Sequence, residues 1–309
     1  MEIGEIVICF LLIACMRVAQ SFSGKGASNL VNNKGLFFQY GAFYQAVSAI
    51  ASLATLIIVG FNGFNLPTLI CSFINALLFA TSLYCSLTAM KSAKMIVCSM
   101  FSMGGIVIPC IVGIFLFNEP MSLQKWIAIA IFLFAVFLLN LKGKNEENKK
   151  MKPTTWVLLV LLFTVEGLVL IVQKYFAILV PNGNVATFSF LTFSLNAIIL
   201  SLASVVNAFL NAKNNEEGQS SSTKLLKFEK LPLPLFLYGT LLGIAIFVIN
   251  FLVTTLSKTI PSAQLFPISC AISIAVTTIV SMLRFKEKLN WKNIVGIIIG
   301  LVSIIMLNV

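Results

Sequence analysis

Residues 233–256 read LPLFLYGTLLGIAIFVINFLVTTL, a run of 24 residues that contains no charged side chain. A helix of about 20 such residues crosses the hydrocarbon core of a bilayer, because each residue adds about 1.5 Å. The run is too long for a strand and lacks the alternation of a lipid-facing strand. It therefore predicts a membrane-spanning helix.

The rest of the chain repeats this pattern. Of its 309 residues 59% are hydrophobic and 10% are charged, and its mean hydropathy is +1.01. A soluble domain is about a quarter charged, so the composition disfavours a water-soluble enzyme. We predict an all-α integral membrane protein with ten transmembrane helices, over residues 3–24, 36–60, 66–89, 93–117, 122–141, 154–176, 184–210, 233–256, 260–283 and 290–308.

Two halves of the chain resemble each other. Phe117-Asn118-Glu119-Pro120-Met121-Ser122 and Phe285-Lys286-Glu287-Lys288-Leu289-Asn290 are 168 residues apart, and Leu66-Pro67 matches Leu233-Pro234 at an offset of 167. We predict a first five-helix repeat over 1–141, a polar linker over 142–153 and a second repeat over 154–309. Five helices is an odd number, so the second repeat is inverted, as is typical of secondary transporters. The alternative is a duplicated scaffold without a cavity.

These features resemble the drug/metabolite transporter superfamily, EamA type, over the whole chain. The resemblance rests on ten helices in two halves and on the short element around Glu119 and Glu287 that precedes the fifth and tenth helices. Asn118 and Lys286 stand where the family usually has glycine. The resemblance implies cytoplasmic termini.

Charge asymmetry indicates the opposite orientation. The loops after the odd-numbered helices hold 17 of the 21 Lys and Arg residues, against three on the other side. The positive-inside rule then places the 142–153 and 211–232 loops in the cytoplasm of a cell-membrane protein, with both termini outside. The net charge of +11 is thereby read as a topology signal and not as a sign of nucleic-acid binding.

Metal and cofactor chemistry finds little support in the sequence. Histidine is absent, and the seven cysteines lie in apolar runs without a C-x-x-C pair. We expect no metal, no cofactor and no catalytic residue. Glu2 and Glu5 at the N-terminus argue against a cleaved signal peptide.

Polar stripes follow the third and eighth predicted helices. Ser72, Asn75, Phe79, Ser82 and Ser86 share one face by their spacing, and Gly239, Gly243, Asn250 and Thr254 nearly share another. A polar face in lipid meets either a neighbouring helix or a water-filled cavity. The equivalence of the two helices favours a cavity, while Gly239 and Gly243 are typical of close helix packing.

Two intramembrane charges occupy matching positions of the repeat. Arg17 and Glu166 are 149 residues apart, as are Lys25 and Lys174. An intramembrane carboxylate must pair, become protonated or sit in water. Arg17 has the alternative of snorkelling to the interface, and a purely structural pair with Glu166 also stays open. The candidate substrate-binding residues are Arg17, Gln20, Asn75, Ser82, Glu166, Gln173 and Asn250, and Pro109 and Pro267 are candidate gating or inert kinks.

We expect a secondary transporter, not an enzyme, that moves a small polar or amphiphilic metabolite by alternating access. The charge pair and the resemblance favour an amino acid or a related zwitterion as the small-molecule substrate. The expected partners are the lipid bilayer and a coupling proton or an exchange substrate, and a homodimer stays open. The alternatives are a membrane-embedded enzyme and a channel-like pore.

Overall fold

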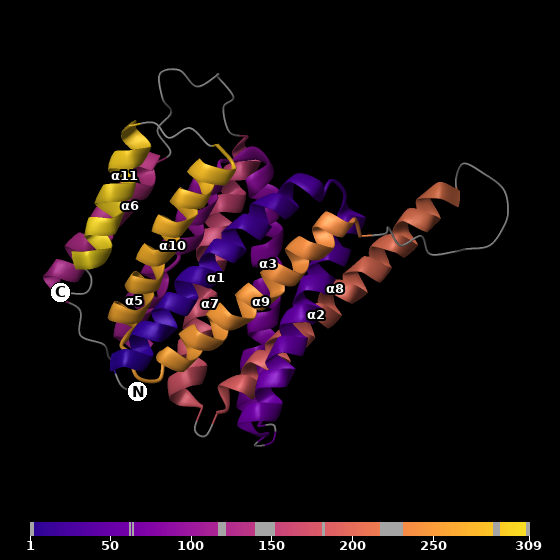
Figure 1. Ribbon diagram of the computed structural model, residues 1–309, viewed down its shortest axis with the longest axis horizontal. Helices are drawn as coiled ribbons and strands as arrows, with labels where there is room; N and C mark the ends of the chain where they lie inside the picture. Colours follow the sequence, from indigo (N-terminus) through magenta and orange to yellow (C-terminus); the bar gives the residue numbers. More distant parts are fainter. Residues whose placement is uncertain are drawn as a thin grey trace.

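The structure is a computed structural model, which describes residues 3–61, 63, 65–116, 122–139, 152–180, 183–216, 231–286 and 291–306. These residues form a bundle of helices, and no strand occurs within the described ranges (Figure 1). The predicted linker falls largely outside them. In chain order the helices are α1 (Ile3–Leu30), α2 (Lys34–Val59), α3 (Leu66–Ser92), α4 (Met95–Gly104), α5 (Val107–Leu116), α6 (Leu123–Leu139), α7 (Pro153–Leu179), α8 (Val185–Glu216), α9 (Leu233–Leu256), α10 (Ser262–Arg284) and α11 (Trp291–Met306).

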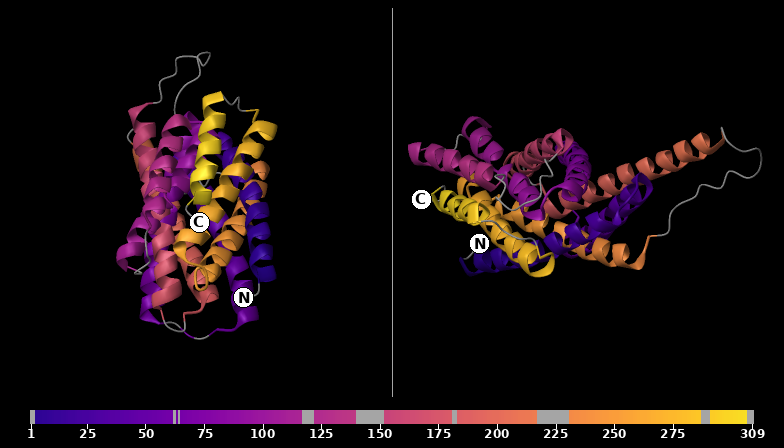
Figure 2. Two further views of the ribbon diagram at one scale, coloured as in Figure 1. Left: turned by 90° about the vertical axis from the view of Figure 1, so that its left-hand side faces the viewer. Right: turned by 90° about the horizontal axis from the view of Figure 1, so that it is seen from above.

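The described helices confirm the α-helical membrane class. Six of them, α1, α2, α3, α7, α8 and α9, are long and apolar enough to cross a bilayer. The helices α6 and α11 have 17 and 16 described residues, so the ten-span count stays a prediction. The 32 residues of α8 extend about 48 Å, which exceeds a hydrocarbon core of about 30 Å, and its end projects from the bundle (Figures 1 and 2).

The run predicted as one helix over 93–117 is divided into α4 and α5. Pro109 has no backbone N–H, so the carbonyl of Gly105 cannot receive its usual helical bond. That carbonyl instead accepts from the Ile108 N–H at 3.0 Å, and Ile106 N–H donates to Met103 at 3.2 Å. The helix is thereby interrupted at residues 105 and 106.

Asparagine caps begin two of the long helices. Asn33 Oδ1 accepts from Leu36 N–H at 2.7 Å, and Asn65 Oδ1 accepts from Thr68 N–H at 3.0 Å. Each cap satisfies a backbone donor that has no partner inside the helix. These caps fix where α2 and α3 start.

Helices of the two halves pack against each other. The pairs α2 with α8, α3 with α7, α1 with α9 and α6 with α11 make the main contacts. The α6–α11 pair lies at one edge of the molecule (Figure 1). The hydrophobic core therefore forms between helices that are far apart in sequence.

Glycines allow the closest helix crossings. A Cβ added to Gly243 would lie 2.5 Å from the carbonyl oxygen of Tyr44, and one added to Gly239 would meet the Phe43 ring at 2.7 Å. The expected packing role of Gly239 and Gly243 is thus confirmed. A second crossing joins Gly105 to Gly167, where an added Cβ on Gly167 would lie 2.6 Å from the Gly105 carbonyl oxygen.

Candidate functional site

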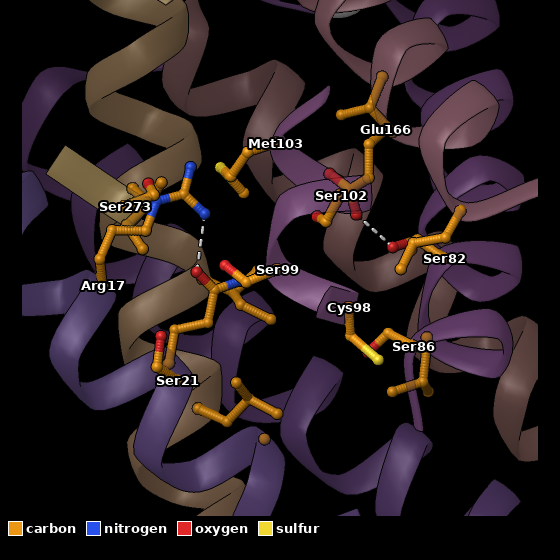
Figure 3. A pocket seen from close by; sticks show the side chains of 18 of the residues that line it. Arg17, Ser21, Ser82, Ser86, Cys98, Ser99, Ser102, Met103, Glu166 and Ser273 are labelled. Carbon is orange, nitrogen blue, oxygen red and sulfur yellow. Dashed lines mark hydrogen bonds between the residues drawn. The ribbon is translucent and has the colours of Figure 1, made fainter. Parts of the chain in front are cut away.

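A cavity lies where α1, α3, α4, α7, α9 and α10 meet, with Tyr44 of α2 also in its lining (Figure 3). The volume of its interior is about 140 Å³. Typical small-molecule sites measure about 300–1,000 Å³. The cavity therefore suits a ligand at the small end of the metabolite range.

The α1 wall supplies a cation. The Arg17 guanidinium donates from Nη1 to Gln20 Oε1 at 2.7 Å, because residues three apart share a helix face. Its Nε atom is buried and has no hydrogen-bond partner in the structure. Arg17 thus retains donor capacity within the cavity wall.

The opposite wall supplies a carboxylate. The Ser82 hydroxyl of α3 donates to Glu166 Oε1 of α7. The glycine crossing holds this part of α7 in place, since a Cβ added to Gly105 would lie 3.2 Å from the Glu166 Cβ. Packing of backbone against backbone therefore positions Glu166 beside the α4–α5 break.

Arg17 and Glu166 lie on opposite sides of the cavity in Figure 3, which draws Ser99 and Met103 in the space between them. Neither residue forms an ion pair within the part of the chain that the structure describes. A direct structural pair, one of the sequence alternatives, is therefore not what holds them in place. Both charges line the same cavity.

Hydroxyl groups line a further part of the wall. Ser21 and Thr277 place their hydroxyl oxygens 2.9 Å apart, and the Ser99 hydroxyl donates to Thr277 at 3.2 Å. These bonds tie α1, α4 and α10 together. Ser102 and Ser273 also line the cavity.

An amide pair closes the α7–α9 side of the cavity. Gln173 Nε2 donates to Asn250 Oδ1 at 2.6 Å, and Asn250 Nδ2 donates to the Ile246 carbonyl at 2.8 Å. Gln173 is only 1% exposed. The pair links residues of the two helices across 77 positions of sequence.

Six of the seven candidate binding residues line this one cavity; they are Arg17, Gln20, Ser82, Glu166, Gln173 and Asn250. Asn75 is absent from the lining. It is buried at 1% exposure, and its Oδ1 has no hydrogen-bond partner in the structure. Along the same stripe, Ser72 donates to the Phe188 carbonyl of α8 at 3.2 Å, so this end of the stripe serves helix packing.

The two candidate kink residues differ in their surroundings. Pro109 is buried near the start of α5, next to the break. Pro267 lies within α10, and this helix continues past the proline to Arg284. The structure does not describe the side chain of Pro267. The helix interruption is thus found at the first proline.

Sequence analysis did not single out the hydroxyls of α4 and α10. Ser269, Ser273, Thr277 and Ser281 recur every fourth residue, and all four are buried. This is the same kind of stripe that marked the third predicted helix. The spacing of these four residues could therefore have predicted a polar face on α10.

Metal-binding side chains are not clustered in the described part of the chain. No group of three or more His, Cys, Asp or Glu residues lies together there. The cysteines Cys98 and Cys270 are buried thiols, and the Cys270 thiol contacts the Met103 carbonyl at 3.6 Å.

Comparison with known proteins identifies a fold and nothing narrower. No protein-family model matches the chain, and no curated protein sequence matches it. A solved crystal structure, described only as that of a protein, superposes on 99% of this chain and 96% of its own, with a TM-score of 0.67 and 9% sequence identity. The two chains therefore share a fold over nearly their whole lengths.

Proposed function

We propose that the protein is a secondary transporter that moves an amino acid or a related zwitterion across a cell membrane by alternating access. One observation carries this proposal: the half-buried side chains of Arg17 and Glu166 face one cavity from opposite walls, inside a bundle of apolar helices. The lipid bilayer surrounds the bundle, and the small-molecule substrate enters the cavity.

A zwitterion complements these two charges. A guanidinium binds a carboxylate through two parallel hydrogen bonds, and a carboxylate binds an ammonium group. Charged groups inside a membrane cost several kcal/mol unless they are paired or hydrated. A ligand that carries both charges offers Arg17 and Glu166 a directly hydrogen-bonded partner each, whereas the two residues form no ion pair with each other in the described part of the chain.

The packing supports an inverted repeat of two five-helix halves. Exchanging the halves converts the α1–α9 contact into α7–α3, the α2–α9 contact into α8–α3, and the α1–α10 contact into α7–α4. All of these contacts occur. In secondary transporters such a repeat places the substrate site at the interface of the halves.

Two lysines at matching positions of α1 and α7 bind backbone carbonyls of other helices or of the segments that follow them. Lys25 of α1 donates to the Met90 carbonyl near the end of α3 at 3.1 Å. Lys174, at the matching position of α7, donates to the Ser257 and Ile260 carbonyls beyond α9 at 3.4 and 3.2 Å. A cation at a helix C-terminus is stabilising.

The same proposal includes ten membrane spans and membership of the drug/metabolite transporter superfamily. It also places the 142–153 and 211–232 loops in the cytoplasm. A coupling proton or an exchange substrate supplies the driving force. The fold shared with a solved structure extends over 99% of the chain, so both proposed halves lie within it. A homodimer is compatible with this architecture and is not required by the site.

Uptake into proteoliposomes tests the proposal. A carrier gives saturable uptake of a radiolabelled amino acid and accelerated exchange against internal substrate, whereas a channel gives neither and an enzyme alters its substrate. Arg17→Gln and Glu166→Gln should each abolish uptake. Lys34→Gln and Glu5→Gln remove matched charges from exposed positions and should retain it. Uptake that survives both cavity substitutions would overturn the proposed site.

A further inference from the structure

The hydrogen bonds between α7 and α9 fix the direction of two amide groups. The Ile246 carbonyl can only accept, so Asn250 must present its Nδ2 to it, at 2.8 Å. Asn250 Oδ1 is then the atom that faces Gln173. Since that oxygen also only accepts, Gln173 must present Nε2 to it, at 2.6 Å. The orientation of Gln173 therefore follows from a backbone carbonyl one helix away.

This chain of bonds leaves Gln173 Oε1 as an acceptor without a donor. The atom is buried and has no hydrogen-bond partner among the residues that the structure describes, although Gln173 lines the cavity. The neighbouring lining residues Leu170, Ile249 and Val253 have apolar side chains. A buried unpaired acceptor is costly, and native structures rarely keep one without a function or a bound molecule. A donor group of a ligand in the cavity, or an ordered water there, would satisfy this acceptor.

A second acceptor lies on the same face of the same helix. Seven residues separate Glu166 from Gln173, which is nearly two turns, so both side chains leave α7 in almost the same direction. Their Cα atoms are about 10.5 Å apart along the axis. A ligand that bridges them needs two donors at least about 5 Å apart, because each hydrogen bond adds about 2.8 Å.

We propose that Gln173 is a specificity-determining residue, and that the cavity takes a zwitterion with a second hydrogen-bond donor at the far end of its side chain. The ammonium group binds Glu166, the carboxylate binds Arg17, and the distal hydroxyl or amine donates to Gln173 Oε1. This inference rests on the proposed transport of zwitterions and adds the chemistry of their side chain.

Three probes of equal length test the inference on the purified full-length protein. Lysine and 6-hydroxynorleucine carry a distal donor after four methylene groups, whereas 2-aminoheptanoic acid ends in a methyl group. Binding is measured as protection against thermal unfolding over a concentration series. The wild-type protein should bind 6-hydroxynorleucine about 5- to 150-fold more tightly than 2-aminoheptanoic acid, since the latter leaves Gln173 Oε1 unpaired.

Two variants assign this preference to one residue. Gln173→Met keeps the length of the side chain and removes its acceptor. This variant should therefore bind 6-hydroxynorleucine and 2-aminoheptanoic acid about equally tightly. Gln124→Met makes the same change on α6, where Gln124 Nε2 bonds the Met306 carbonyl at 3.4 Å, and should keep the wild-type preference. The wild-type ratio tests the inference even when Gln173→Met does not fold.

The outcomes separate this inference from the proposed function. Equal binding of the hydroxyl and methyl probes to the wild-type protein overturns the role of Gln173 and leaves zwitterion transport standing. A preference that persists in Gln173→Met does the same. Failure of all three probes to protect the wild-type protein overturns the inference of a long side chain with a distal donor, and the amino-acid uptake assay then tests the zwitterion class separately.

Discussion

Replacing Gly167 by alanine should destabilise the protein although alanine is the better helix former. An added Cβ would lie 2.6 Å from the Gly105 carbonyl oxygen and 2.7 Å from the Ile108 side chain. An ordinary carbon–oxygen contact is at least about 3.3 Å. The α7 backbone must therefore move away from the α4–α5 break by about 0.7 Å or more.

The size of the effect follows from two opposing terms. Alanine gains up to about 1 kcal/mol over glycine inside a helix. Forcing a methyl group into a packed interface costs about 1–3 kcal/mol, and here the obstacle includes backbone, which cannot change rotamer. We expect a net loss of about 1–2 kcal/mol. Because Glu166 adjoins the crossing, substrate affinity should fall as well.

Gly300→Ala provides the matched control. Its added Cβ would lie 3.5 Å from Met100 and 3.6 Å from Ala135, which are ordinary contacts, so this variant should equal or exceed the stability of the wild-type protein. The two variants are compared by their melting temperatures in the same detergent, with the loss of monodisperse protein on heating as the measured signal. If Gly167→Ala melts at or above the temperature of Gly300→Ala, the description of the crossing is wrong.

Four further predictions concern the cavity and the topology. In a cysteine-free background, Asn250→Cys should react with a small water-soluble thiol reagent, and substrate should protect it. Asn75→Cys should not react, because Asn75 lies outside the cavity lining. Equal labelling of the two variants would contradict the structure. Ser82→Ala removes a bond to a carboxylate, worth about 1.5–3 kcal/mol, so substrate affinity should fall while Ser72→Ala keeps it, and unchanged binding would remove Ser82 from the site. If a proton is coupled through Glu166, Glu166→Gln should lose uptake driven by a pH gradient but keep substrate exchange, and equal loss of both would instead indicate ammonium binding. A reporter that is active only in the cytoplasm, fused after the C-terminus, should be silent if the charge count is right, and active if the orientation implied by the family resemblance is right.

The helices could be predicted from the sequence because lipid imposes one rule on the backbone. Only helices satisfy every backbone donor without water, so long apolar runs are helical wherever they occur. The run 233–256 coincides with α9 at both ends. The division at Gly105 was less visible, because a proline inside a helix causes either a bend or a break.

Only part of the candidate site could be predicted from the sequence. Arg17 and Glu166 stand out as charges in apolar runs, and a charge in a membrane needs an explanation. A stripe such as Ser72 to Ser86 shows that one face of a helix is polar, but it does not show which neighbour covers each turn. Asn75 and Ser82 therefore looked alike, although only Ser82 lines the cavity. The bond between Gln173 and Asn250 depends on how two helices are placed, which no local pattern encodes.

The contact between Gly105 and Gly167 has a mechanical consequence. Interlocked side chains resist sliding, whereas a close approach of two backbones, here with Ile108 and Phe163 packed beside it, can serve as a pivot about which the helices tilt. In a lever, displacement grows with distance from the fulcrum, so the ends of α7 travel furthest and the residues beside the crossing travel least. Glu166 adjoins that fulcrum, so its carboxylate stays nearly stationary during any tilt that swings Lys174 away from the carbonyls beyond α9.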